Sequence, residues 1–258
     1  MSIRLLYGMK RDKPYKVSAV SYANTFPFIY GIEQKMNHSD LEMSLDVPAV
    51  CAEKLSKGVV DIGLVPVAEL SNIPNAQIIS KYCIGAIGEV KTVLLMSKLP
   101  LDEISEVYLD SESKTSVNLI KVLASRFWKK NWKWQNAPSS FPIPEKHDSI
   151  VLIGDKTYQF RDDYPYIYDL AEVWLEYTGK PFVFAAWVVN RKLPIEFIQD
   201  FNQALSFGLH NIDAALDVYA HESQKDELSD YLNNYISYDL DEAKLEGMEL
   251  FLNYLKTI

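Results

Sequence analysis

The sequence predicts an α/β fold with mainly parallel sheets. Short apolar runs typical of buried strands alternate with segments whose apolar residues recur every three or four positions, as in amphipathic helices. Apolar residues make up 48% of the 258 residues, enough for a sizeable core, and no repeat or low-complexity linker divides the chain. We therefore expect two lobes, with the apolar runs 93–97 and 182–189 as crossovers: a discontinuous lobe of residues 1–95 and 187–258, and an inserted lobe of residues 96–186.

The first half of the chain is predicted to alternate between strands and helices. A strand over residues 15–20 and a polar loop precede a helix from Pro27, because proline is favoured in the first helical turn. Pro48 and Gly58 similarly mark the start and the stop of a short helix. Further strands, rich in apolar residues, are expected over residues 41–47, 59–65, 93–97 and 107–109.

The second half is predicted to contain more helix. Apolar residues spaced by three or four positions from Val117 to Phe127 form one stripe, and Gly179 ends a helix over residues 171–177. Strands are expected over residues 150–153 and 182–189. Two C-terminal helices are indicated by apolar stripes, the first carrying Phe201, Leu205, Leu209 and Ile212, the second Leu245, Met248, Leu252 and Leu255.

Composition and charge argue against several classes of protein. Acidic residues outnumber basic residues by 35 to 26, and the net charge of −9 argues against nucleic-acid binding. Lysines at 129, 130 and 133 alternate with tryptophans, which we interpret as a solvated face whose rings pack inward. The sequence has neither a membrane-spanning apolar run nor a secretory signal, so we expect a cytoplasmic protein without a membrane partner. The two cysteines, Cys51 and Cys83, are far apart in sequence, so we expect them to be reduced thiols. The histidines lack the spacing of metal ligands, so we expect no metal site; they are His38, His147, His210 and His221.

Two polar segments are candidates for ligand binding, because each follows a predicted strand and precedes a predicted helix. Ligands of open α/β sheets bind at the carboxyl ends of strands, and helix N-termini attract anions. Helix capping alone also explains these residue types at these positions. The side chains concerned are Ser21, Tyr22, Asn24 and Thr25 in the first segment and Ser113, Thr115 and Ser116 in the second.

Three further positions are weaker candidates. Gly154 and Asp155 form a predicted tight turn after a strand, where a purely structural role is the simpler interpretation. The tyrosines around Tyr168 either hydrogen-bond a ligand or pack in the core. Glu69 is the carboxylate best placed after a strand, although its position at a helix start explains it equally well. The sequence has no nucleophile elbow, dinucleotide fingerprint or P-loop.

Several segments resemble, in the same order, the motifs of one family over about residues 15–215. That family comprises the chorismate dehydratases of the futalosine route of menaquinone biosynthesis. The matching segments are SYANTFP at 21–27, VDIGLVPVAEL at 60–70, VKTVLLMS at 90–97, SKTS at 113–116, VLIGD at 151–155, and YIYDL at 166–170 followed by PFVFA at 181–185.

The resemblance implies a type II periplasmic-binding-protein-like fold, in which two α/β lobes hold the ligand in a cleft between them. It implies loss of water from chorismate, a dianion, to give 3-[(1-carboxyvinyl)oxy]benzoate without a cofactor or metal; we expect a monomer or homodimer. It makes Asn24 catalytic, its amide donating to the departing hydroxyl or to a substrate carboxylate. Substrate-binding roles are expected for Ser21, Tyr22, Thr25, Thr92, Ser113, Thr115, Ser116, Gly154, Asp155 and Tyr168.

Two segments depart from the family pattern. Residues 86–89 replace a Ser-x-Gly-Pro segment, so a hydroxyl is missing at Ala86, and we expect Thr92 or a neighbouring backbone N–H to replace that contact. Pro48-Ala49-Val50 replaces a Pro-Ser-Glu helix start, which removes an N-cap and is expected to affect stability only.

Two other functions stay open at the level of sequence. One is 1,4-dihydroxy-6-naphthoate synthase of the same pathway, whose usual Ser-Pro-Cys-Pro-Asn-like opening is absent here; the other is a non-catalytic small-molecule receptor or sensor. The catalytic base is open as well. Because no histidine lies in a recognised motif, we hypothesise that the carboxylate on the enolpyruvyl arm of the substrate removes the ring proton.

Overall fold

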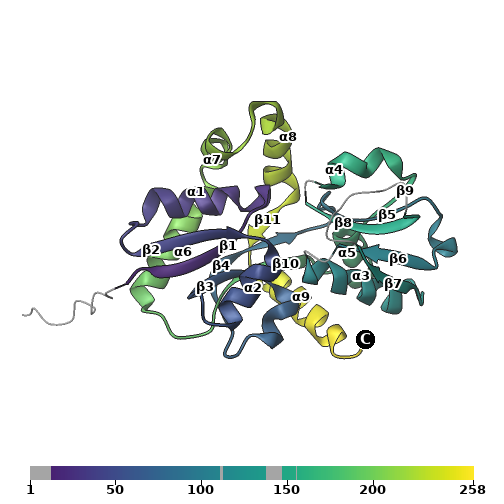
Figure 1. Ribbon diagram of the computed structural model, residues 1–258, viewed down its shortest axis with the longest axis horizontal. Helices are drawn as coiled ribbons and strands as arrows, with labels where there is room; N and C mark the ends of the chain where they lie inside the picture. The colour runs from purple at the N-terminus through teal and green to yellow at the C-terminus, as the bar shows by residue number, and fades with distance from the viewer. Residues whose placement is uncertain (1–12, 111–112, 138–146, 155) are drawn as a thin grey trace, which may run out of the picture.

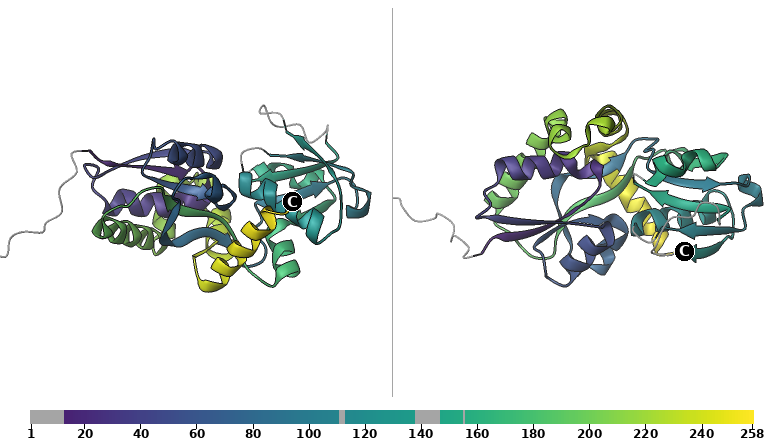
Figure 2. Two further views of the ribbon diagram at one scale, coloured as in Figure 1. Left: turned by 90° about the horizontal axis from the view of Figure 1, so that it is seen from below. Right: turned by 45° about the horizontal axis from the view of Figure 1, so that its top comes forward.

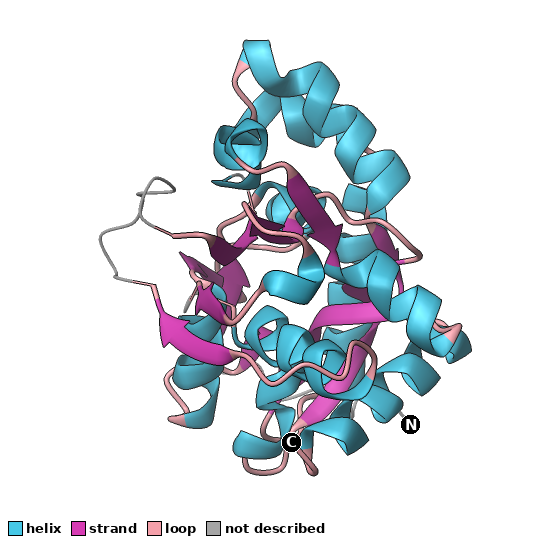
Figure 3. Ribbon diagram, turned by 90° about the vertical axis from the view of Figure 1, so that its right-hand side faces the viewer, coloured by secondary structure: helices cyan, strands magenta, loops and turns pink. Residues whose placement is uncertain are grey.

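The computed structural model describes residues 13–110, 113–137, 147–154 and 156–258. Two lobes, each built on one β-sheet, lie side by side along the long axis of the molecule (Figure 1). Viewed along that axis, helices lie on both sides of the strands (Figure 3). Within the described residues, no helix combines the length and the apolar character needed to cross a bilayer.

The first lobe contains the six-stranded sheet. One of its two central strands, β10 (Phe182–Val189), comes after the second lobe in the sequence. Strands β1 to β3 of this sheet run parallel, whereas β10 is antiparallel to both of its neighbours, β3 and β4. In sheet order the strands are β11 (Ser237–Asp239), β4 (Gln77–Ala86), β10 (Phe182–Val189), β3 (Ile62–Pro66), β1 (Tyr15–Val20) and β2 (Leu41–Asp46). The helices of this part of the chain are α1 (Phe26–Lys35), α2 (Pro48–Ser56), α6 (Ile195–Leu209), α7 (Ile212–Tyr219), α8 (Lys225–Asp230) and α9 (Glu242–Leu255).

The second lobe contains a five-stranded sheet of mixed direction. Strand β6 is parallel to β7 and β8, while β5 is antiparallel to β8 and β9. In sheet order the strands are β7 (Lys133–Asn136), β6 (Glu106–Leu109), β8 (Ser149–Ile153), β5 (Val93–Ser97) and β9 (Tyr166–Asp169), with helices α3 (Lys114–Arg126), α4 (Lys156–Phe160) and α5 (Leu170–Thr178). Short 3₁₀ turns occupy Ala23–Thr25, Val67–Asn72, Leu101–Glu103, Arg161–Asp163 and Glu222–Gln224, and a π turn occupies Tyr231–Tyr235.

The expected alternation of strands and helices is confirmed, but the expected predominance of parallel strands is wrong. The chain leaves the first lobe through β4 and returns from the second lobe through β10, so these strands must run in opposite directions. The apolar pattern does not predict strand β4, because Ser80 and Lys81 interrupt it. Helix α6 ends at Leu209, and Ile212 instead begins α7, because Asn211 adopts a non-helical conformation.

The two lobes are connected by two segments. Residues 87–92, called the crossover below, join β4 of the first sheet to β5 of the second, and residues 179–181 join α5 to β10. The apolar runs expected to be crossovers, β5 and β10, each lie within a single sheet. Boundaries after residue 95 and before residue 187 therefore fall inside strands. We propose that the lobe boundaries lie in the two connecting segments instead.

Helix α9 joins the cores of the two lobes. Figure 2 shows it running from the first lobe to the second. Its Phe251 packs edge-on against Trp174 of α5, at a centroid distance of 6.0 Å, and against Phe182 of β10, at 5.0 Å. All three rings are almost completely buried, and one continuous apolar core runs through both lobes. Cys51 and Cys83 lie buried in this core as free cysteines.

The tryptophans near residue 130 pack as expected. Trp132 is buried and lies within 6 Å of the rings of Trp128 and Trp134, at 5.7 and 5.8 Å. Lys129 and Lys133 are exposed, and the partly exposed Lys130 forms an ion pair with the exposed Asp102. This segment is therefore a packed face with solvated lysines.

Helices α1 and α6 cross so closely that glycine is required at the contact. A Cβ on Gly208 would lie 1.7 Å from the carbonyl oxygen of Pro27, and one on Gly31 would lie 2.0 Å from that of Ala204. Because these neighbours are backbone atoms, side-chain rotation cannot relieve the overlap. The contact fixes the first turn of α1, which follows the loop that carries Asn24.

Gly208→Ala is expected to lower the free energy of unfolding by about 3 kcal/mol, since α1 and α6 must move apart. Urea denaturation measures the change. Ser206→Ala on the same helix is the control and should change stability by less than about 0.5 kcal/mol. A Gly208→Ala variant as stable as the wild type would contradict this helix contact.

Candidate functional site

A cleft lies between the lobes, where strands of both sheets end. Its polar lining consists of Tyr22 and Asn24 from the first lobe, Thr92 from the crossover, and Ser113, Ser116 and Gly154 from the second lobe. Apolar residues complete the walls, among them Val20, Pro48, Ile84, Ile153 and Phe184. The cleft thus combines a mostly apolar surface with a few neutral hydrogen-bonding groups, as small-molecule sites do.

Asn24 is held by three groups that do not line the cleft. The Thr25 hydroxyl donates to Asn24 Oδ1 at 3.2 Å, and the Tyr238 hydroxyl donates to the Asn24 carbonyl at 3.0 Å. The N–H of Ser21 anchors the start of the loop by donating to the Asp46 carbonyl at 3.0 Å. Within the described residues, Asn24 Nδ2 makes no hydrogen bond, so the amide has its donors available to a ligand.

The N-terminus of α3 supplies hydroxyl and N–H groups on the opposite side of the cleft. Ser113 caps the helix, accepting from the Ser116 N–H at 3.2 Å, and its hydroxyl donates to Ser116 Oγ at 2.8 Å. Ser116 Oγ accepts this bond and keeps its own proton for another partner. A helix start of this kind also carries partial positive charge, which favours an anion.

Thr92 and Gly154 line the cleft where the crossover enters the second lobe. Thr92 Oγ1 lies 2.8 Å from the Tyr231 hydroxyl and 3.5 Å from the Val90 carbonyl. Gly154 adopts a left-handed conformation with φ of 63°, and a Cβ there would meet the Tyr22 ring at 3.9 Å. Tyr22 and Gly154 thus face each other across the cleft from the two lobes.

Four of the expected binding residues lie near this cleft without lining it. Ser21 is exposed, and Thr25 is buried beneath Asn24. Thr115 Oγ1 donates to the Phe184 carbonyl at 3.0 Å and accepts from the Ala68 N–H at 3.4 Å, so it joins the lobes. Tyr168 packs edge-on against Trp128, with centroids 5.9 Å apart.

None of the remaining candidates is among the described residues that line the cleft. Asp155 lies outside the described residues. Glu69 accepts from the Asn72 amide at 3.1 Å and does not line the cleft. Ala86 is fully buried at the end of β4. Within the described residues, no group of three His, Cys, Asp or Glu side chains comes together as metal ligands would.

Asp169 is a structural carboxylate beside the site. Its oxygens accept from the N–H groups of Val90 and Lys91, at 2.9 and 2.7 Å, and from Ala171 and Glu172 in the first turn of α5, at 3.0 and 3.2 Å. Burial raises the pKa of Asp169 to about 6, against the opposing effect of these N–H groups. Asp169 lies in the YIYDL motif found in the sequence. Its four partners are backbone N–H groups, which every residue except proline has, so the sequence could not predict them.

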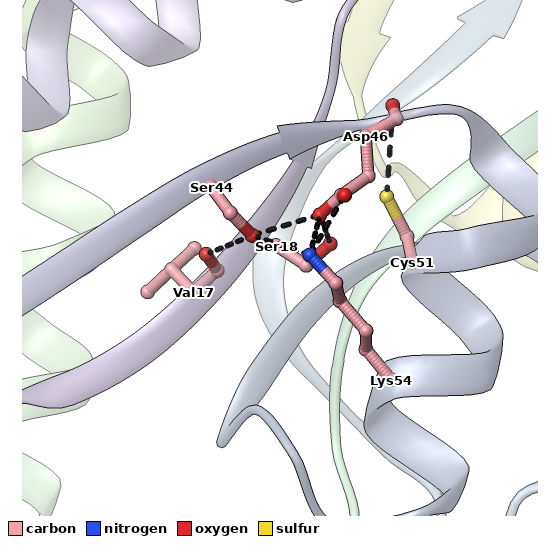
Figure 4. A network of polar contacts seen from close by, with 6 residues as sticks. All are labelled: Val17, Ser18, Ser44, Asp46, Cys51 and Lys54. Carbon is pink, nitrogen blue, oxygen red and sulfur yellow. Dashed lines mark hydrogen bonds and ion pairs between the residues drawn. The ribbon is translucent and has the colours of Figure 1, made fainter.

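A second, partly buried carboxylate supports the first-lobe wall (Figure 4). Asp46 forms an ion pair with Lys54 at 2.6 Å and accepts from the hydroxyls of Ser18 and Ser44, both at 2.7 Å. Burial opposes its ionisation, but the hydrogen bonds from Lys54 and the two serines hold the pKa of Asp46 below its usual 3.8. Pro48, two residues later, begins α2 without a side-chain cap and lines the cleft.

Asp46→Asn is expected to lower the free energy of unfolding at pH 7 by about 1–3 kcal/mol, because Lys54 loses its anionic partner. The folded-state pKa lies below the unfolded value of 3.8, so the stabilisation is complete above that value and lost as pH falls through the folded-state pKa.

Urea denaturation at pH 7 and at a series of pH values below 4 measures this effect. The difference between wild type and variant should shrink over the acidic series, and a constant difference would show that charge is not its source. Glu42→Gln on the same strand is exposed and serves as the control.

Solved structures identify the class of protein. A protein from Archaeoglobus fulgidus superimposes with a TM-score of 0.77 at 13% identity, covering 96% of this chain and 98% of its own. A conserved Candida albicans gene product, described as having the generic periplasmic binding protein fold, superimposes with a TM-score of 0.65 at 10% identity, covering 95% and 90%. The molecule is thus a two-lobed α/β protein with the periplasmic-binding-protein fold, as expected.

The sequence comparisons are more specific. The family model for menaquinone biosynthesis matches residues 15–257, and the chain belongs to this menaquinone biosynthesis family. The chorismate dehydratase of Thermus thermophilus is 24% identical over 265 residues, which cover 94% of this chain and 96% of that protein. The family expected from the motifs is therefore confirmed.

Proposed function

We propose that this protein is a chorismate dehydratase, which eliminates water from chorismate to give 3-[(1-carboxyvinyl)oxy]benzoate in the futalosine route, in the cytoplasm. The observation that carries the proposal is the placement of the Asn24 amide opposite the N-terminus of α3 across one cleft. Donors on the two sides suit a ligand whose carboxylate binds at the start of α3 while its hydroxyl faces the Asn24 amide. Membership in the menaquinone biosynthesis family and similarity to the Thermus enzyme support the same function.

In this proposal the protein binds and orients, and the substrate supplies the base. Asn24 Nδ2 donates to the departing hydroxyl. The Ser116 hydroxyl, oriented by its bond from Ser113, and the start of α3 bind a carboxylate. The enolpyruvyl carboxylate removes the proton from the ring carbon beside the hydroxyl, and the C–H electron pair forms a ring double bond as the C–O bond to the hydroxyl breaks. The departing hydroxide takes up the proton from the enolpyruvyl carboxylic acid and leaves as water, and the ring becomes aromatic. Asp169 is engaged by four backbone N–H groups and Glu69 lies outside the cleft, which supports a base on the substrate.

The direct test is to incubate the pure protein with chorismate and follow the loss of the diene absorbance, with identification of the product by mass. Asn24→Ala is expected to reduce the rate by about 100- to 1,000-fold, because it removes a donor that acts on charge developing in the transition state. Asn72→Ala, an exposed amide that contacts Glu69, is the control and should retain full turnover.

The outcomes of this assay separate the alternatives. Chorismate that binds but stays intact would indicate a receptor or sensor. Chorismate that neither binds nor reacts would contradict the proposal and leave the naphthoate synthase of the same pathway to be assayed. Full turnover by a folded Asn24→Ala variant would contradict the assignment of this residue alone.

Ser113→Ala combined with Ser116→Ala is expected to raise KM by about tenfold or more, since it removes the Ser116 donor and the Ser113 hydroxyl that orients it. A hydrogen bond to a charged group contributes about 1.5–3 kcal/mol. Steady-state kinetics measure the change, and melting temperature reports any loss of the α3 cap. Ser125→Ala on the exposed face of α3 is the control. An unchanged KM in a folded double variant would exclude these serines as the carboxylate site.

A further inference from the structure

The crossover segment that carries Thr92 is held from both lobes. Asp169 of the second lobe binds its backbone, accepting from the N–H groups of Val90 and Lys91. From the other side, Asp230 lies 3.4 Å from Lys91 Nζ, and the Tyr235 ring lies 3.5 Å from the same atom. Lys91 itself has φ of 64°, a left-handed conformation that side-chain-bearing residues rarely adopt. Such a conformation persists where surrounding contacts determine it.

Next to this segment, Tyr231 and Thr92 form a buried hydroxyl pair. The two oxygens are 2.8 Å apart, and each residue is only 3% exposed. The alternative acceptor for Thr92, the Val90 carbonyl, lies at 3.5 Å, the outer limit of a hydrogen bond. Tyr231 follows α8 and packs in the shared core, while Thr92 lines the cleft. The Tyr231 hydroxyl is thus the near partner that sets the orientation of a cleft hydroxyl.

We propose that Tyr231 is a positioning residue that acts through Thr92, an inference that rests on the proposed function. The phenol is the more acidic hydroxyl and so the better donor. When Tyr231 donates to Thr92 Oγ1, the threonine proton is left to point into the cleft, toward a substrate oxygen. Hydrogen bonds in such a chain polarise and strengthen one another. Without the phenol, the Thr92 hydroxyl turns to the Val90 carbonyl and is lost to the substrate.

A double-mutant cycle on chorismate turnover tests this inference. Tyr231→Phe removes only the hydroxyl and is expected to lower kcat/KM by about tenfold, and Thr92→Val by at least as much. If Tyr231 acts through Thr92, adding Tyr231→Phe to the Thr92→Val variant changes kcat/KM by less than about twofold. Thr92→Ser keeps the hydroxyl and should restore the sensitivity to Tyr231→Phe. Unfolding in urea, measured on the same variants, shows whether each is folded.

Tyr219→Phe is the matched control, because its hydroxyl contacts Glu33 outside the cleft, and it should leave kcat/KM unchanged. Losses that add independently in the double variant would overturn the inference while leaving the proposed function intact. A Tyr231→Phe variant that loses stability but keeps its kcat/KM would also overturn the inference and leave the proposed function intact. The Tyr231 hydroxyl would then have a structural role alone. Absence of turnover by the wild type would overturn the proposed function and this inference together.

Discussion

The arrangement of the cleft depends on one buried carboxylate, that of Asp169, which accepts four backbone N–H groups. Two of these donors belong to the crossover and two to the first turn of α5. They satisfy the carboxylate oxygens where water is largely excluded, and a buried polar group without such partners would be costly. Because Thr92 and β5 follow Val90 and Lys91 directly, the same carboxylate fixes where the second lobe begins. This attachment holds the backbone of the left-handed Lys91 from the second lobe, opposite the contacts that its side chain makes with Asp230 and Tyr235.

Neutral donors take the place of charge in the cleft. The protein carries a net charge of −9, which opposes a dianion at long range. Lys156, just after Gly154, is paired with Asp110 at 3.2 Å. The cleft instead offers the Asn24 amide, the serine hydroxyls and the N–H groups at the start of α3. Oriented dipoles of this kind need no reorganisation when charge moves within a bound ligand, which suits an elimination in which charge shifts along the ring.

The sequence predicted those parts of the fold and site that depend on local pattern. Apolar runs located β1, β5, β8 and β10, and strand ends followed by helix starts located Asn24, Ser113 and Ser116. Within each polar segment, however, the pattern does not tell which side chains face the ligand. Thr25 and Thr115 turn away from the cleft to support it. Tyr231 and Tyr238 reach the site from more than 130 residues away in sequence, as contacts formed only by tertiary packing.

The central place of β10 in the first sheet has a consequence for how the chain assembles during synthesis. Strands β3 and β4 are neighbours in sequence, yet β10 separates them in the sheet. During synthesis on the ribosome, β1 to β4 therefore emerge before β10, and β10 becomes available only after the whole second lobe has been synthesised. That lobe is one uninterrupted stretch and is free to fold first. The unpaired edges of β3 and β4 are exposed throughout this interval, which makes the first lobe the part of the nascent chain most in need of protection from aggregation.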